Sequence, residues 1–90
     1  MTQIYFIQQE CGDGDTYLHF FRTESEAMAY GQRQWDTMTD AVQERYRKNP
    51  HGYHRLSMGV IWAESDMDDD DLTDAIFSQD FGTELYDWTK

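Results

Sequence analysis

Three stretches of the chain are rich in the apolar and aromatic residues that favour β-strands. Residues 3–9 and 16–22 carry apolar side chains, many of them aromatic, on both faces. The segment between them, 10–15, contains two glycines and two aspartates, which are residue types that favour turns. This arrangement predicts a β-hairpin. Residues 53–64 alternate in the manner of a β-strand, which predicts a third strand.

The segment 24–47 has helical periodicity instead. Thr23 and Glu26 have the spacing of a capping box at its start. Behind them, small or apolar residues recur every three or four positions: Ala27, Gly31, Trp35, Met38, Val42 and Tyr46. Thr39 offers a second N-cap, so the segment is either one long helix or two helices that meet just before this residue. We expect Pro50 to end it.

The last third of the chain has weaker periodicity. Leu72, Ala75 and Ile76 predict a helix of one or two turns, which Gly82 ends. Residues 84–88 fit either a fourth strand or a packed tail.

These elements predict the α+β fold class. We expect a small antiparallel sheet of three or four strands with the 24–47 segment packed on one face, in the order β-β-α-β plus an acidic C-terminal helix or strand. Residues 1–90 should form a single domain with one modest core. A sheet covered on one face would leave Trp62 and Trp88 partly exposed, or would require a partner to cover them. The expected core comprises Ile4, Phe6, Leu18, Phe20, Ala27, Gly31, Trp35, Met38, Val42, Met58, Val60 and Trp62.

The charge of the chain is strongly negative and unevenly distributed. Its 18 Asp and Glu residues stand against 7 Lys and Arg, a formal net charge of −11. The part 64–90 holds 10 of the acidic residues and one base. Because such a field repels phosphates, we expect no direct binding to nucleic acid or to an anionic membrane. The aromatic fraction of 16% argues against a disordered acidic chain.

The remaining features exclude several classes of site. Cys11 is the single cysteine, so no intramolecular disulfide can form. We expect a cytoplasmic protein, because the N-terminal residues lack the regions of a signal peptide and no stretch approaches the roughly 20 apolar residues of a membrane span. No nucleophile–base pattern, phosphate-binding glycine loop or catalytic carboxylate pair is recognisable. We therefore expect no enzymatic activity and no cofactor.

One stretch partly matches a calcium loop. Asp66, Asp68 and Asp70 have its opening spacing, but Asp71 stands where glycine is required and Phe77 where the bidentate glutamate is required. We expect no dedicated metal site. Loose binding of a divalent cation and a solvated loop that caps the following helix are the alternatives.

The acidic part 64–90 is the strongest functional signal. Carboxylates one helical turn apart, or alternating along a strand, lie roughly 5–7 Å from one another, a spacing comparable to that of phosphates along a nucleic-acid strand. A rigid acidic face can therefore occupy the nucleic-acid groove of a basic protein, with an aromatic residue as an anchor. The predicted partner-binding residues are Asp66, Asp68, Asp69, Asp70, Asp71, Asp74, Asp80, Glu84, Asp87 and Trp88.

A second hypothesis assigns the binding to aromatic residues. Trp62, Tyr86 and Trp88 would anchor a homodimer, a larger homo-oligomer or an adaptor interface, and the acidity would only keep the protein soluble.

Two resemblances support the first hypothesis. The stretch Phe20-Phe21-Arg22-Thr23-Glu24-Ser25-Glu26-Ala27, followed by Trp35-Asp36-Thr37-Met38-Thr39, resembles a pattern in small uncharacterised proteins of phages and bacterial mobile elements. It covers residues 17–47 and implies no catalytic residue. In size and acidity the chain is also similar to phage-encoded anti-restriction and anti-CRISPR inhibitors, several of which mimic nucleic acid. That similarity implies an inhibitor of a basic, nucleic-acid-handling protein.

Overall fold

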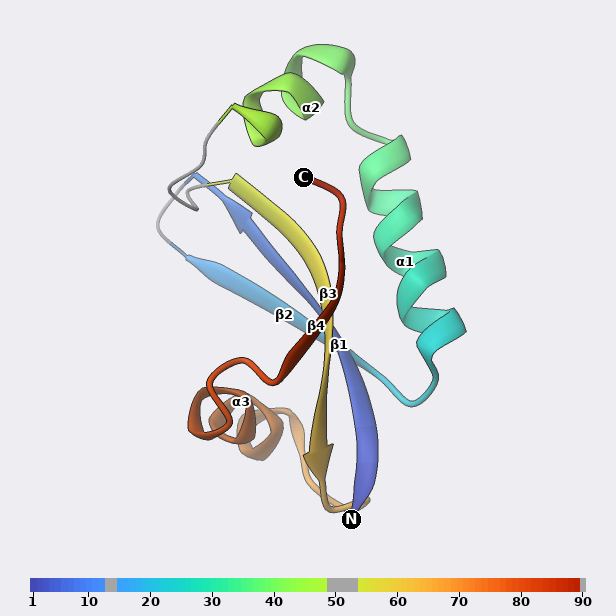
Figure 1. The fold of residues 1–90 in the computed structure, drawn as a ribbon, viewed down its shortest axis with the longest axis vertical. Coiled ribbons are helices and arrows are strands. Elements are labelled where there is room, and N and C mark those ends of the chain that lie inside the picture. The colour runs from blue at the N-terminus through green and yellow to red at the C-terminus, as the bar shows by residue number, and fades with distance from the viewer. Residues whose placement is uncertain (13–14, 49–53, 90) are drawn as a thin grey trace.

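Four antiparallel strands form one twisted sheet in the order β2-β1-β3-β4 (Figure 1). The computed structural model describes residues 1–12, 15–48 and 54–89, so the predicted helix end at Pro50 and part of the hairpin loop lie outside the described residues. The strands are β1 (Thr2–Cys11), β2 (Thr16–Phe21), β3 (His54–Ala63) and β4 (Thr83–Asp87), and the helices are α1 (Glu24–Asp36), α2 (Asp40–Arg47) and α3 (Asp69–Ser78). The predicted α+β class is confirmed, with the fourth strand present.

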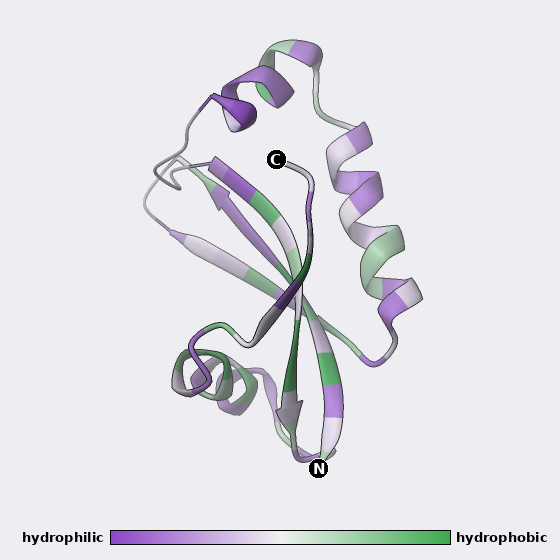
Figure 2. Ribbon diagram, in the orientation of Figure 1, coloured by the Kyte–Doolittle hydropathy of each residue, from purple (hydrophilic) through white to green (hydrophobic). Residues whose placement is uncertain are grey.

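The helices pack on both faces of the sheet. Ile4 and Ile61 pack with Ile76 of α3 in one cluster, whereas Ile7 and Met58 pack with α1 and α2 in another. Successive strand residues face opposite sides, so these two clusters are two separate cores. The expectation of a sheet covered on one face is therefore incomplete, because α3 covers part of the second face. Apolar residues concentrate on β1, β3 and α3, while α2 is mostly hydrophilic (Figure 2).

Each helix begins at a capping side chain. The Thr23 hydroxyl accepts the backbone N–H of Glu26 at 3.2 Å, and the Thr39 hydroxyl accepts that of Val42 at 3.3 Å. The second cap separates α1 from α2, so the alternative of two helices is the right one. At α3 the Asp68 carboxylate accepts the backbone N–H of Asp71 at 2.9 Å.

Trp88 is the clearest departure from the expected core. Its side chain is only 5% exposed, because α1 carries Gly31 at the contact and a Cβ there would lie 2.2 Å from the indole Cη2. The indole Nε1 donates to the Gln32 side chain at 2.9 Å. Trp62 is 54% exposed, so its place in the expected core is wrong and its expected partial exposure is confirmed. Leu18, Phe20, Met38, Val42 and Val60 are half-buried, whereas Ile7, Leu56, Ile61 and Ile76 are fully buried core residues that the expected set lacked.

Strand β4 covers only part of β3 and joins it irregularly. The register shifts between Met58 and Gly59, which is a β-bulge. Before β4 begins, the Gln79 side chain takes the place of a strand beside β3: it accepts the Trp62 N–H at 3.1 Å and donates to the Trp62 carbonyl at 2.7 Å. The residues between α3 and β4 have positive φ angles of 54° at Asp80, 62° at Phe81 and 59° at Gly82.

Candidate functional site

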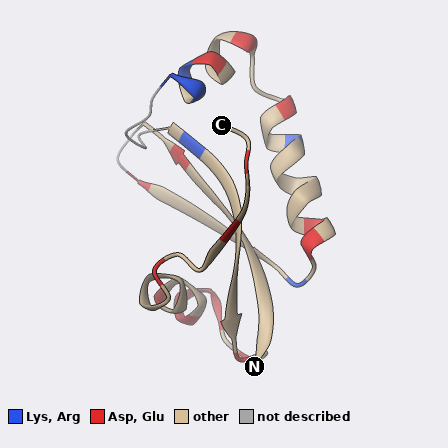
Figure 3. Ribbon diagram, in the orientation of Figure 1, with Lys and Arg blue, Asp and Glu red and all other residues tan. Residues whose placement is uncertain are grey.

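Most of the predicted acidic residues lie on α3 and the turn before it. They are exposed, and none forms an ion pair with a described Lys or Arg: Asp66, Asp68, Asp69, Asp70, Asp71 and Asp74. Figure 3 shows this acidic helix apart from the basic residues at the end of α2. Asp69–Asp71 are the first turn of α3, where their charge complements the helix dipole. These three residues are therefore helical and do not form a loop, whereas the expected capping of the following helix is confirmed at Asp68.

Glu84 and Asp87 belong to a different group. The Arg55 Nη2 lies 2.6 Å from the Glu84 carboxylate, and the Arg55 Nε lies 3.9 Å from the Asp87 carboxylate. Asp87, whose side chain is 7% exposed, also accepts the Thr89 N–H at 2.8 Å. These contacts join β3 to β4, so Asp87 has a structural role and offers little surface to a partner.

Trp88 does not belong to the candidate surface. Its indole is buried against α1, so it cannot contact a partner in this structure. The expectation that it anchors a partner, in either hypothesis, therefore needs a different aromatic residue. Trp62 and Tyr86 remain accessible, at 54% and 46% exposure.

Two phenylalanines supply aromatic surface beside the acidic helix. Phe77 and Phe81 are 56% and 37% exposed, and their rings meet edge to face with centroids 5.3 Å apart. Asp74 and Asp80 lie close to them in the chain. The sequence shows that Phe77 and Phe81 are four residues apart across the end of α3. It gives no indication of the positive φ angle that Phe81 adopts in the structure.

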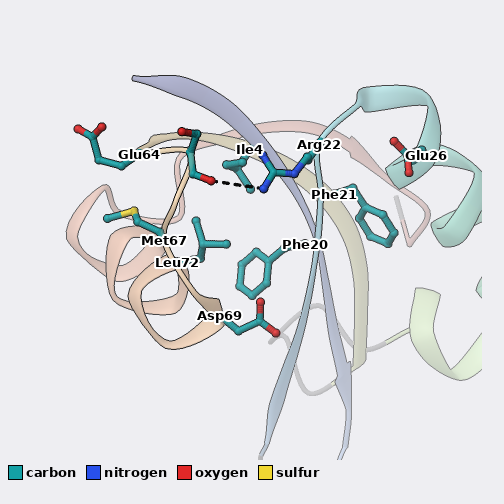
Figure 4. Close-up of a pocket in the computed structure, with 10 residues that line it drawn as sticks. Ile4, Phe20, Phe21, Arg22, Glu26, Glu64, Met67, Asp69 and Leu72 are labelled. Atoms are coloured by element: carbon teal, nitrogen blue, oxygen red, sulfur yellow. Dashed lines mark hydrogen bonds between the residues drawn. The ribbon is translucent and has the colours of Figure 1, made fainter.

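A pocket of about 290 Å³ opens between β2 and α3 (Figure 4). Phe20 and Leu72 line its apolar part, and the Arg22 Nη2 donates to the Ser65 carbonyl at 3.3 Å across one side. Asp69 is the one predicted site residue that lines it. The hydrogen bond links the start of α1 to the turn before α3, which favours a structural role for Arg22.

A second depression, which we call the β4 hollow, has a volume of about 260 Å³. Its lining includes Gln8, Arg55, Ser57, Asp80, Phe81 and Glu84. Gln8 and Ser57 are only 5% and 3% exposed although both are polar. The hollow brings Asp80 and Glu84 of the predicted set together with Gln8, a polar strand residue that carries no functional signal in the sequence.

The described residues contain no group of three or more His, Cys, Asp or Glu side chains that could hold a metal ion, and Asp66–Asp71 do not converge into one. None of the described helices combines the length and apolar composition needed to cross a membrane. No protein-family model matches the chain, and neither the characterised proteins nor the solved structures include one significantly similar to it.

Proposed function

We propose that this protein is a non-enzymatic inhibitor that occupies the nucleic-acid-binding surface of a basic protein, as anti-restriction and anti-CRISPR proteins of the nucleic-acid-mimic type do. The observation that carries the proposal is the outer surface of α3. Its carboxylates are exposed and lack basic partners among the described residues, and Phe77 lies on the same helix. Carboxylates without intramolecular partners are available to Arg and Lys of another protein.

The rigidity of α3 supports the same proposal. Leu72 and Ile76 anchor the helix in the core, and Asp68 caps it. The carboxylates of Asp70 and Asp74 are therefore held one turn apart on a fixed element, which is what a substitute for regularly spaced phosphates requires.

The test is capture of the partner from a lysate of the native host by the immobilised chain, followed by mass spectrometry. The captured protein should bind nucleic acid, and the added chain should displace a labelled oligonucleotide from it, less effectively at high salt. A variant with Asp70→Asn, Asp71→Asn and Asp74→Asn should lose this displacement. The matched control carries Glu24→Gln, Asp36→Asn and Asp40→Asn, which make the same change in net charge on α1 and α2. Displacement that survives the α3 variant would contradict the proposal.

The exposure of Trp62 and Tyr86 favours a second candidate, a homo-oligomer or adaptor with an aromatic interface. It predicts a dimer in light scattering that persists at high salt and is lost on Trp62→Ala. A monomer at all salt concentrations would exclude the homo-oligomer.

A further inference from the structure

The β4 hollow has an unused hydrogen-bond acceptor. Gln8 is only 5% exposed, and its Nε2 donates to the Glu10 carboxylate at 3.0 Å. Its carbonyl oxygen accepts no hydrogen bond from any residue that the structure describes. No buried side-chain oxygen of the described residues lacks a partner, so this oxygen is reached by solvent and is open to a donor that enters the hollow from outside.

The hollow also has an excess of negative charge. Arg55 is its one described cation, and both Glu84 and Asp87 balance it. Asp80 forms no ion pair or side-chain hydrogen bond with the rest of the described chain. An incoming donor that carries a positive charge would therefore be favoured over a neutral one.

The third feature is an aromatic wall held at a fixed place. Phe81 lines the hollow beside Asp80, and both residues adopt positive φ angles that non-glycine residues disfavour. Gly82 fixes the loop against β3, because a Cβ there would lie 2.2 Å from the Val60 carbonyl oxygen. A planar guanidinium can stack on an aromatic ring and donate hydrogen bonds to a carboxylate, so a hollow lined by both groups suits it.

We propose that the β4 hollow binds an arginine side chain of a protein partner. The guanidinium would donate to the Gln8 carbonyl and the Asp80 carboxylate and lie against Phe81. A volume of about 260 Å³ is below the range of roughly 300–1,000 Å³ typical of small-molecule pockets, which favours one side chain as the occupant. This inference rests on the proposed function, since it names the chemistry by which a basic partner would be recognised.

The test is an NMR titration of the full-length, ¹⁵N-labelled chain with two probes, N-acetyl-arginine methylamide and N-acetyl-lysine methylamide. The arginine probe should shift the side-chain amide of Gln8 and the backbone amides of Gly59 and Gly82 in a saturable way, and the lysine probe should bind more weakly. Asp80→Asn should weaken the arginine probe about threefold to fivefold, as for one exposed charge pair. Asn also adopts positive φ readily, so this variant should fold. Gln8→Met removes the acceptor in a side chain of similar size and should weaken the probe as well.

Glu24→Gln is the matched control, because it removes one exposed carboxylate on α1, outside the hollow and outside the predicted partner-binding set, and it should leave binding of the probe unchanged. Equal effects of Glu24→Gln and Asp80→Asn, equal binding of both probes, or shifts confined to α3 would each overturn the inference. The proposed function fails separately, when the triple α3 variant keeps displacing the oligonucleotide.

Discussion

Gly31 determines whether the C-terminal end of the chain can close against α1. The indole of Trp88 fills the space above this glycine, with ring atoms 2.2–2.8 Å from where a Cβ would be. Alanine has the higher helix propensity, by about 1 kcal/mol, so a helix without this contact would be stabilised by the exchange. At this position the clash with a large buried ring outweighs that gain.

We predict that Gly31→Ala lowers the free energy of unfolding by about 1–3 kcal/mol, as overpacking does. Denaturant titration gives the value. The control is the same substitution in a Trp88→Phe background, where the smaller ring leaves room and the loss should shrink. An increase in stability in the wild-type background would contradict the packing of Trp88 on α1.

Phe81 adopts a backbone conformation that costs free energy for any residue with a Cβ, about 1–2 kcal/mol relative to the right-handed region. Glycine and alanine at this position both lack the ring, but only alanine retains the unfavourable conformation. We therefore predict that Phe81→Gly is more stable than Phe81→Ala by about 1 kcal/mol, measured by thermal and chemical unfolding. Equal stabilities would show that the loop relaxes when the ring is removed.

At the scale of elements, substitutions of Asp68 can distinguish the capping role of this acidic residue from the effect of its charge. Its carboxylate caps α3, and asparagine caps as well as aspartate does. We predict that Asp68→Asn leaves the free energy of unfolding nearly unchanged, whereas Asp68→Ala lowers it by about 1 kcal/mol. Chemical denaturation monitored by circular dichroism measures both. A similar loss in the two variants would indicate that the charge, and not the cap, stabilises α3.

The elements that local signals specify could be predicted from the sequence. Thr23 and Thr39 mark the starts of α1 and α2 because a cap acts within one turn. The start of α3 is harder to predict, since four consecutive aspartates, Asp68–Asp71, resemble a loop unless their interaction with the helix dipole is considered.

The remaining features depend on contacts between distant residues. Trp88 is buried only because Gly31 lies opposite it, more than fifty positions earlier in the chain. The β4 hollow combines Gln8 of β1 with Asp80 and Glu84, and no local pattern brings these together. Sequence periodicity therefore predicted the sheet and the helices but not the geometry of the candidate site.

At the scale of the whole molecule, charge is separated along a body of 40 × 25 × 18 Å. The basic end of α2 lies toward one end of the long axis, and α3 lies in the opposite half (Figures 1 and 3). If a partner binds through α3, as proposed, the basic end of α2 would stay exposed and away from the interface.

We predict that the place of a charge affects stability more than the net charge does. Arg45→Glu and Arg47→Glu change the net charge equally, but Arg47 lies over the Trp35 ring, 5.2 Å from its centroid. Arg47→Glu should lower the free energy of unfolding by about 0.5–1 kcal/mol, and Arg45→Glu by less. Thermal unfolding compares the two, and neither should alter oligonucleotide displacement. Equal destabilisation would assign the effect to net charge.

The bonds from Gln79 to Trp62 have a consequence for behaviour at high concentration. An unpaired strand edge can recruit a strand from another molecule, which is a common start of aggregation. The Gln79 amide occupies both backbone groups of Trp62 and so protects the part of β3 that lies before the start of β4. Gln79→Ala should therefore increase light scattering with protein concentration and time, whereas Ser78→Ala, next to it, should not. One side-chain amide would then contribute to the resistance of the protein to aggregation during storage as well as to its fold.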